Sequence, residues 1–295
     1  MSAGGVPLFV PAHVARLRDK AAGLAVPLIL DLEDAVPPGE KDAARRGAAD
    51  LVEALPGRCT VRINPLTVER GFGTAVGADD LPAVLRPGLA GILAPKIDDE
   101  AALHDVDAHL SDAERRAGVA EGSTPLRVIV ETARGVVGVH ALALAAAALP
   151  RRVDLAFGAG DLTTDLGIEW GRDESAFDTP RALVPLACRA ANLGRPMDTV
   201  FADVGDIEGL RASALRGKAL GYAGKPAIHP GQLEVIQDVY RPTPCELEWA
   251  REVVDAAARY AADGAGAFLL EGRMIDDPVV ARARDLLATT TEGPR

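Results

Sequence analysis

The feature of this sequence that most constrains its fold is an alternation of short apolar runs with longer stretches of helical spacing. The runs are rich in β-branched residues, and the stretches between them repeat Ala, Leu and Arg at the spacing of helices. This alternation is typical of βα units that build a parallel sheet. Eight runs are present, at 8–11, 28–32, 59–64, 91–96, 126–131, 153–158, 198–203 and 224–229.

Eight strands is the number that closes a barrel, although a doubly wound open sheet would show the same alternation. The polar residues favour the barrel, because its strands all deliver their carboxyl ends to one face, where active sites lie. We therefore predict an α/β fold of the (β/α)8 TIM-barrel type. The residues at the ends of the expected strands are Asp31, Glu33, Asp34, Arg62, Asn64, Lys96, Glu131, Asp161, Asp203 and His229.

Helices are expected between the strands, at 12–24, 39–55, 99–110, 135–148, 180–193, 206–220 and 231–239. Beyond residue 240 the pattern changes to a helix, a glycine-spaced stretch and a last helix, at 244–262, 263–272 and 277–289. The glycines suit hinge motion. We predict that residues 1–240 form the barrel catalytic domain and that residues 241–295 form a C-terminal helix and lid segment.

Composition narrows the class of protein. Hydrophobic residues make up 48% of the chain and aromatic residues only 4%, which suits a core of Ala, Val, Leu and Ile between parallel strands and helices. The net charge of −11 argues against nucleic acid or an anionic membrane as a partner. The three cysteines fit neither a disulfide framework nor a zinc site. We expect no signal peptide, no membrane span and a cytoplasmic location.

Two carboxylates are candidates for a metal site. Glu131 and Asp161 stand thirty positions apart, the length of one βα unit, which would place them at the ends of adjacent strands. Two carboxylates with open water positions suit Mg²⁺. The spacing alone leaves structural alternatives open, because Glu131 could form an ion pair with Arg62 and Asp161 could cap a following helix.

Other candidates come from neighbouring strand ends. Arg62, in Val-Arg-Ile-Asn-Pro, could hold a carboxylate or stabilise an enolate oxygen, and it could also balance the acidic residues. Glu33 and Asp34 are expected to orient metal-bound water and Arg62 rather than to bind the metal directly. Lys41 has two open interpretations, a role beside this site or an ordinary position on a helix surface.

Taken in order, a series of motifs resembles the HpcH/HpaI aldolase/citrate lyase β-subunit-like superfamily. The motifs run collinearly from about residue 8 to residue 280: LFVP, LILDLEDAV followed by Lys41 and Arg45, VRIN, GILAPK, VIVETARG, LAFGAGDL with DLG, and GKPAIHPGQ. The resemblance implies a trimeric or hexameric (β/α)8 enzyme that uses Mg²⁺, or Mn²⁺ in its place, and an acyl-CoA substrate. It places the family's metal ligands on Glu131 and Asp161 and its substrate-binding arginine on Arg62.

The resemblance also implies a catalytic acid in the tail. In family members that cleave malyl- or citramalyl-CoA, a C-terminal lid from a neighbouring subunit brings an aspartate into the site. The matching motif here is Arg-Met-Ile-Asp, which maps this role to Asp276. Asp277 before Pro278 is expected to cap the last helix, which would leave Asp276 free for catalysis. An exposed loop acid is the alternative interpretation of Asp276.

The CoA contacts of the family correspond here to Phe9, Arg16 and Lys20. Arg16 and Lys20 are four residues apart and would share one helix face, where they could contact phosphates or be ordinary surface charges. Two departures from the family pattern stand nearby. Ala12-His13 follows Pro11 where the family has PGN or PGS, and Gly160 replaces a Glu just before Asp161.

The resulting hypothesis is a Mg²⁺-dependent carbon–carbon lyase. It would cleave a short 3-hydroxyacyl-CoA, such as malyl-, citramalyl- or citryl-CoA, to acetyl-CoA and a 2-keto acid, or catalyse the reverse condensation. We expect a homo-oligomer in which lids are donated between subunits. The alternatives are an acyl-CoA thioesterase of the same family, a class II pyruvate aldolase that acts on a free acid, and a β subunit that works only in a citrate lyase complex.

Overall fold

A computed structural model of the chain describes residues 6–66, 76–262 and 267–291. These residues fall into two compact units, one within Gly5–Gln237 and the other within Asp238–Arg295. No helix in the described ranges is both long and apolar enough to cross a membrane. All three cysteines are free, and burial raises the pKa of the Cys59 thiol to about 11 and that of Cys188 to about 12.

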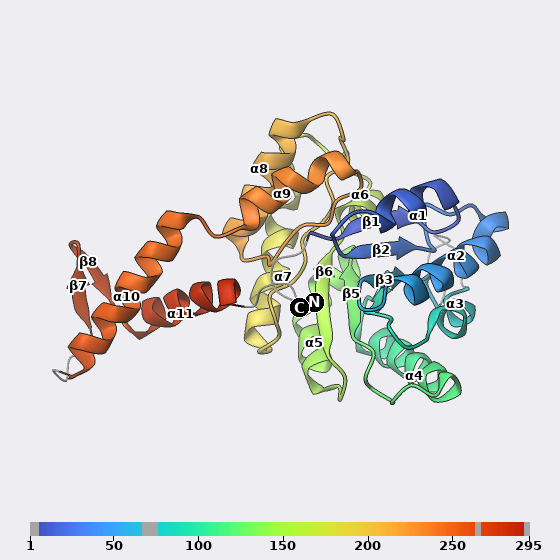
Figure 1. Ribbon diagram of the computed structural model, residues 1–295, viewed down its shortest axis with the longest axis horizontal. Helices are drawn as coiled ribbons and strands as arrows, with labels where there is room; N and C mark the ends of the chain where they lie inside the picture. The colour runs from blue at the N-terminus through green and yellow to red at the C-terminus, as the bar shows by residue number, and fades with distance from the viewer. Residues whose placement is uncertain (1–5, 67–75, 263–266, 292–295) are drawn as a thin grey trace. The chain divides into compact units, whose positions relative to one another are not determined.

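The first unit is built on a parallel sheet of six strands in sequence order (Figure 1). The first six predicted strands are confirmed, because each overlaps one strand of this sheet. Their burial is nearly complete, as expected for parallel strands covered on both faces. The strands are β1 (Leu8–Pro11), β2 (Leu28–Asp31), β3 (Cys59–Arg62), β4 (Gly91–Ala94), β5 (Leu126–Val130) and β6 (Val153–Phe157).

The last two predicted strands, 198–203 and 224–229, are wrong as regular strands. In their place the structure has isolated parallel bridges that join Ala156 to Met197, Met197 to Gly224, and Leu8 to Ala227. Prolines at 196 and 226 have no N–H to donate, which interrupts a regular ladder. The bridges run from β6 to β1 through two further chain segments. This arrangement is consistent with a TIM-like barrel.

Helices alternate with the strands; from α1 to α6 each packs against the next, and α7 packs against both α5 and α8. Asp99 caps α4 by accepting a hydrogen bond from Ala102 N at 2.9 Å, and Thr132 caps α5 through Gly135 N at 3.0 Å. The helices are α1 (Ala15–Ala22), α2 (Lys41–Ala54), α3 (Gly77–Val84), α4 (Glu100–Ala117), α5 (Ala133–Ala148), α6 (Ala159–Leu166), α7 (Asp178–Ala190), α8 (Ile207–Leu220) and α9 (Leu233–Tyr240). Short 3-10 turns lie at Pro38–Glu40, Ser175–Phe177 and Pro230–Gln232.

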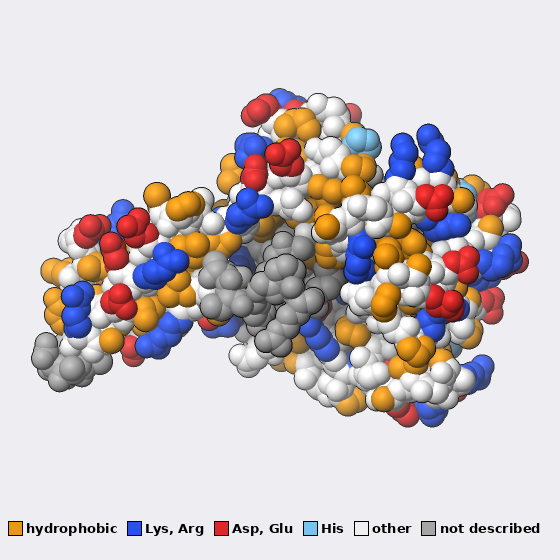
Figure 2. Space-filling model, in the orientation of Figure 1, with side chains coloured by type: hydrophobic (Ala, Val, Ile, Leu, Met, Phe, Trp, Pro, Cys, Tyr) orange, Lys and Arg blue, Asp and Glu red, His pale blue; other side chains and the backbone are white. Residues whose placement is uncertain are grey.

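Aliphatic side chains form the core of the first unit, as the low aromatic content predicts. One buried cluster joins residues of four strands, with Phe9 of β1 and Met197 packed against it; its members are Ile29, Leu93, Ile129 and Ala156. On the surface of this unit shown in Figure 2, basic and acidic side chains are interspersed. The four residues of this cluster stand one or two positions before the last residues of their strands, so the polar residues at the strand ends follow the core directly.

The second unit contains two helices and a hairpin. α10 (Pro244–Ala262) and α11 (Asp277–Thr291) pack together, and β7 (Phe268–Leu270) pairs with β8 (Arg273–Ile275) in antiparallel fashion. The hairpin turn has positive φ at both Glu271 and Gly272, the geometry of a type I′ turn. Gly272 thus serves a tight turn, whereas Gly264 and Gly266 of the predicted hinge lie outside the described residues. A core of its own stabilises this unit: Ala250, Val253, Ile275, Val280 and Ala283.

Candidate active site

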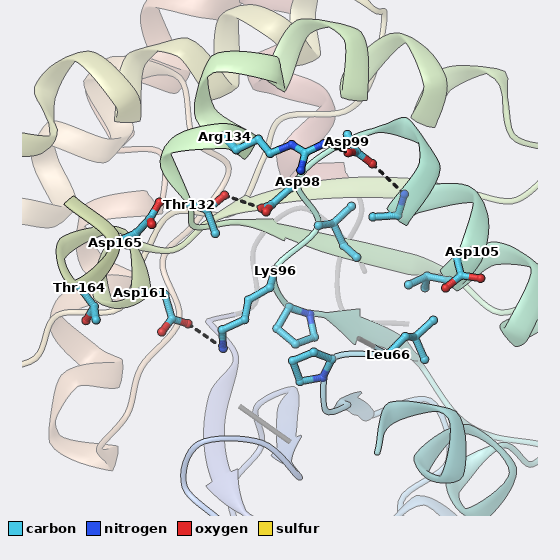
Figure 3. Close-up of a pocket in the computed structure, with 15 residues that line it drawn as sticks. Leu66, Lys96, Asp98, Asp99, Asp105, Thr132, Arg134, Asp161, Thr164 and Asp165 are labelled. Atoms are coloured by element: carbon cyan, nitrogen blue, oxygen red, sulfur yellow. Dashed lines mark hydrogen bonds and ion pairs between the residues drawn. The ribbon is translucent and has the colours of Figure 1, made fainter. Parts of the chain in front are cut away.

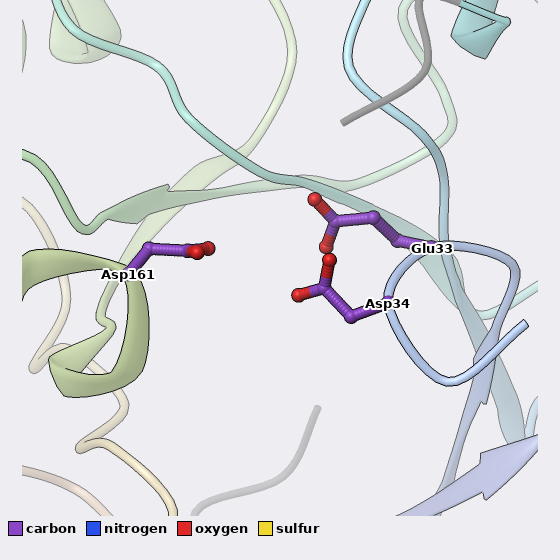
Figure 4. Close-up of side chains that lie close together, drawn as sticks. All are labelled: Glu33, Asp34 and Asp161. Carbon is purple, nitrogen blue, oxygen red and sulfur yellow. The ribbon is translucent and has the colours of Figure 1, made fainter. Parts of the chain in front are cut away.

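Three carboxylates converge where strands of the first unit end. Figure 4 shows the side chains of Glu33, Asp34 and Asp161 pointing toward one another. One oxygen from each lies within 4.8 Å of the others. Glu33 and Asp34 follow β2, and Asp161 lies in the first turn of α6, directly after β6. The capping interpretation of Asp161 is wrong, because the helix begins at Ala159 and Gly158 is its N-cap residue.

Arg62 is fixed beside this cluster by an acid that the sequence analysis did not single out. Its Nε and Nη2 each donate to Asp31 at 2.7 Å, a bidentate pair, and its Nη1 lies 3.0 Å from Glu33 and 3.6 Å from Asp34. Asp31 and Arg62 are partners in the register of β2 and β3. That register is the signal that could have identified the pair. Arg62 also lies over the ring of Phe9 at 5.1 Å.

The charges of Asp31 and Glu33 respond differently to burial. Burial favours the neutral form of both, but Arg62 and two backbone N–H groups hold the pKa of Asp31 below its usual range. Burial and the nearby Asp34 raise the pKa of Glu33 to about 7, although Arg62 and Lys96 oppose this shift. Glu33 is only 2% exposed, and its Oε2 has no hydrogen-bond partner among the described residues. The partner of Oε2 is instead the charge of Arg62, whose Nη1 lies 3.0 Å away.

Glu131 ends β5, the neighbour of β6, so the prediction that it stands at an adjacent strand end to Asp161 is confirmed. Its Oε1 accepts a hydrogen bond from Lys96 N at 2.8 Å. Burial raises the pKa of Glu131 well above its usual range, and the charges of Glu33 and Asp161 add to this shift. Gly158 makes room for the side chain, since a Cβ there would lie 2.6 Å from Glu131 Oε2.

Lys96 is the site residue whose part the sequence analysis missed. Its Nζ contacts Glu33 and lies 3.1 Å from Asp161, as Figure 3 shows for the second contact. Its backbone has φ of 55°, a left-handed conformation that is uncommon for a residue with a side chain. The sequence shows Lys96 only as one more polar strand end. Neither its backbone conformation nor its two carboxylate partners can be read from spacing.

Lys41 ties two strand ends together. Its Nζ donates to the carbonyl oxygens of Leu32 at 2.7 Å and Glu33 at 2.8 Å, and to Asn64 Oδ1 at 2.7 Å. These three bonds exclude an ordinary surface position for Lys41. Asn64 in turn donates from its backbone N and its Nδ2 to Asp80, each at 2.7 Å. Lys41 therefore holds the loop that carries Glu33 against the end of β3.

A small cavity of about 80 Å³ opens beside Lys96 and Asp161 (Figure 3). Pro95 and Ile97 give it apolar walls, and acidic groups and hydroxyls such as Asp165 and Thr164 give it polar ones. Arg134 lines it while it is paired with Asp99 at 2.6 Å. The cavity is therefore a place where a small polar molecule could meet the carboxylate cluster.

The predicted CoA contacts have mixed surroundings. Phe9 packs on the core cluster and under Arg62, whereas Arg16 and Lys20 are exposed on α1. Next to them, His13 has a buried Nδ1 without a hydrogen-bond partner among the described residues. The role of Phe9, Arg16 and Lys20 in binding CoA stays a prediction.

Asp276 lies in the second unit and caps α11, so the prediction that Asp277 is the cap is wrong. Asp276 Oδ1 accepts a hydrogen bond from Val279 N at 3.3 Å, and its carbonyl oxygen accepts one from Val280 N at 3.0 Å. The helix begins at Asp277, as the predicted range 277–289 has it, so the residue before it, Asp276, is in the capping position. The catalytic role of Asp276 stays a prediction.

Comparison with known proteins identifies the family of the chain. Residues 6–230 match the family HpcH/HpaI aldolase/citrate lyase. The chain is 32% identical to citrate lyase subunit beta of Leuconostoc mesenteroides subsp. cremoris, over 95% of this chain and 91% of the relative. It is 33% identical to a (3S)-malyl-CoA thioesterase of Cereibacter sphaeroides strain KD131, over 95% and 92%.

A solved structure covers nearly the whole chain. Protein CitE from Mycobacterium tuberculosis, in complex with magnesium, acetoacetate and coenzyme A, is 32% identical with a TM-score of 0.75, over 98% of each chain. The alternation of strands and helices with polar residues at the strand ends places the chain in a broad class of α/β folds whose members have many different activities. The family match is more specific: this chain belongs to the HpcH/HpaI aldolase/citrate lyase family and is similar to citrate lyase β subunits.

Proposed function

We propose that this protein is a Mg²⁺-dependent carbon–carbon lyase that acts on a short 3-hydroxyacyl-CoA, such as malyl-, citramalyl- or citryl-CoA. The products would be acetyl-CoA and a 2-keto acid, and the reverse condensation uses the same groups. The observation that carries the proposal is the convergence of Glu33, Asp34 and Asp161 beside Lys96 and Arg62, with the buried Glu131 held by Lys96 N and close enough for the charges of Glu33 and Asp161 to raise its pKa further. The proposed scaffold is a (β/α)8 barrel, with the bridge segments as its last two strand positions.

The residues present fit a hard divalent cation. The clustered groups offer carboxylate oxygens, the donors that Mg²⁺ and Mn²⁺ prefer, and one oxygen from each of Glu33, Asp34 and Asp161 lies within 4.8 Å of the others. In this proposal Glu131 and Asp161 hold the cation, and Glu33 and Asp34 orient its water and Arg62. When bound, the cation would supply a Lewis acid for the hydroxyl and keto oxygen of the acid half.

The chain's own residues would handle the enolate half of the reaction. Arg62 is permanently charged, and its bidentate pair with Asp31 fixes its direction, so it suits a developing negative charge on the thioester oxygen. Asp276 is proposed to protonate the enolate carbon and, in reverse, to abstract the methyl proton. Support for Asp276 comes from the Arg-Met-Ile-Asp motif. A neighbouring subunit of a trimer or hexamer would supply it, and Phe9, Arg16 and Lys20 would contact CoA.

Thioester hydrolysis is the second candidate activity, and the malyl-CoA thioesterase relative favours it. Hydrolysis would need a water molecule where the enolate leaves. The citrate lyase relatives favour a third reading, a β subunit that is active only within a citrate lyase complex. A class II aldolase that acts on a free keto acid would use the same carboxylates but no CoA contacts.

The test is an assay of the purified protein with Mg²⁺ and malyl-, citramalyl- or citryl-CoA that follows keto acid and free thiol separately. Keto acid with acetyl-CoA would support the lyase, and free thiol without keto acid would replace it by the thioesterase. Inactivity on all three substrates would contradict a self-sufficient CoA enzyme. Asp161→Asn should lower kcat by about 100- to 1,000-fold, because loss of a proposed metal ligand weakens the electrostatic stabilisation of the transition state.

The role of Asp276 has its own test. Asp276→Ala should abolish turnover but leave Mg²⁺ affinity unchanged, because the proposed proton transfer is separate from metal binding. Asp277→Ala is the matched control, since it alters an acid at the next position that has no proposed catalytic role. Because Asp276 also caps α11, thermal unfolding of both variants shows whether the tail remains folded. Full activity of folded Asp276→Ala would remove the residue from the mechanism.

A further inference from the structure

Lys96 carries the positive charge that lies inside the carboxylate cluster. Its Nζ contacts Glu33 and lies 3.1 Å from Asp161, and both acids belong to the trio within 4.8 Å of one another. The Lys96 side chain is 15% exposed and that of Glu33 is 3% exposed. An ammonium in this position neutralises the same oxygens that a divalent cation would need.

The backbone of Lys96 is held in the same place. Its φ of 55° is a conformation that favours glycine, yet the residue is a lysine. The N–H of Lys96 donates to Glu131 Oε1 at 2.8 Å, so both the main chain and the side chain of Lys96 contact carboxylates of the site. One residue thereby contacts Glu33, Glu131 and Asp161. The arrangement is more specific than a lysine that happens to meet a surface acid.

We propose that Lys96 is an internal counter-cation that competes with the divalent cation for Asp161, while its contact with Glu33 keeps the ammonium beside the proposed metal ligands. The ammonium stabilises the carboxylates while no metal is bound, and it withdraws from Asp161 when the metal binds. The cavity that Lys96 lines beside Asp161 gives the side chain room for this movement. The inference rests on the proposed metal site and assigns to Lys96 the control of its affinity.

The experiment is a titration of metal-free protein with Mn²⁺, followed by the electron paramagnetic resonance signal of the free ion. Lys96→Met removes the ammonium and should bind Mn²⁺ about tenfold more tightly, because a cation a few ångströms away no longer repels the metal. Lys96→Arg keeps a cation and should retain the weaker binding of the wild type. Lys218→Met, on α8, removes the same charge away from the site and should leave the affinity unchanged.

Unfolding of the same variants separates competition from a purely structural salt bridge. Without metal, Lys96→Met should unfold at lower temperature than the wild type, because Glu33 and Asp161 lose their cation. At the same saturating Mn²⁺ concentration, the difference in unfolding temperature between Lys96→Met and the wild type should become much smaller, since tighter binding to the folded state stabilises the variant more. If Lys96 forms only a structural salt bridge, Mn²⁺ should stabilise both proteins equally and the difference should remain.

The outcomes are distinguishable from failure of the proposed function. If the wild type binds Mn²⁺ and Lys96→Met binds it equally or more weakly, the competition is overturned and the metal site stands. If neither protein binds Mn²⁺, the metal assignment itself fails, and the inference about Lys96 fails with it. Tighter binding in Lys96→Met and rescue of its stability by metal would together support the inference.

Discussion

Two groups of buried charges in the first unit differ in composition. In one group the positive and negative side chains are equal in number, and in the other the carboxylates are in excess. Behind β6, Arg181 donates to Asp198 at 2.8 Å and to Glu174 at 2.9 Å, and Lys225 lies 3.3 Å from Asp198. Two cations thus meet two carboxylates, all nearly inaccessible to solvent. At the strand ends, the carboxylates Asp31, Glu33, Asp34, Glu131 and Asp161 outnumber the cations Arg62, Lys96 and Lys41.

The comparison shows that burial of charge by itself does not indicate function. The balanced group behind β6 is internally neutral and connects Glu174, which precedes the 3-10 turn Ser175–Phe177, with α7 and the bridge segments, a structural role. At the strand ends, burial raises the pKa of Glu33 and of Glu131, and the charges of the neighbouring carboxylates raise both further. Buried carboxylates with raised pKa values are typical of functional sites, where a bound cation or a positively charged partner balances their charge.

The largest expected effect concerns the balanced group. Arg181→Ala would leave Asp198 and Glu174 buried with one cation fewer, and it should lower the free energy of unfolding by about 3–5 kcal/mol. Denaturant unfolding measures the change. Arg172→Ala is the matched control, because Arg172 pairs with Asp206 at the exposed surface and should change stability little. Equal stability of both variants would contradict the structural role of the balanced group.

The pH dependence of stability should reveal the acid excess. The pKa of Glu33 is raised in the folded protein to about 7, so the stability it contributes is present below its ordinary value of 4.5 and is lost as the pH rises through 7. Metal-free wild type should therefore lose on the order of 2 kcal/mol between pH 4.5 and 7.5 from this group. Glu33→Gln should lack that part of the loss, and denaturant unfolding at each pH in a chelator measures it. Parallel curves for both proteins would argue against the excess.

Saturating Mg²⁺ provides a control for the same experiment. A cation that binds the ionised carboxylates should reduce the loss of stability at high pH in the wild type. In Glu33→Gln, which has one carboxylate fewer, the effect of Mg²⁺ should be smaller. A loss that Mg²⁺ does not change would have another origin.

The smallest effect on the stability of the metal-free protein is expected for Glu131→Gln. Glu131 is buried and its pKa is raised, so the neutral amide should fit the metal-free protein at least as well as the carboxylate does. Mg²⁺ or Mn²⁺ affinity should fall by more than the roughly 10–100-fold that loss of a residue orienting a metal ligand causes, because Glu131 is a proposed ligand itself. Asp198→Asn is the matched change in the balanced group and should reduce stability instead. Equal losses in the free energy of unfolding for Glu131→Gln and Asp198→Asn would contradict the difference between the two groups of charges.

Local sequence patterns predicted much of the fold. Six parallel strands and most of the helices between them follow from hydrophobic periodicity, which acts over a few residues and is visible without tertiary information; the short helix α3 was not predicted. Polar residues at strand ends such as Glu33 and Asp161 could be expected to meet, because parallel strands share one direction. The last two strands were less predictable, since the bridges at Met197 and Ala227 depend on packing around prolines.

By itself, the sequence determined the alternation of strands and helices, the aliphatic core and the gathering of ionisable side chains at one end of the strands. Tertiary structure decided which of those side chains contact one another. The pairing of Arg62 with Asp31 depends on the register of β2 and β3, and the place of Lys96 depends on a left-handed backbone at the end of β4. Both are through-space properties, because charges interact over distances of a few ångströms that spacing along the chain does not encode.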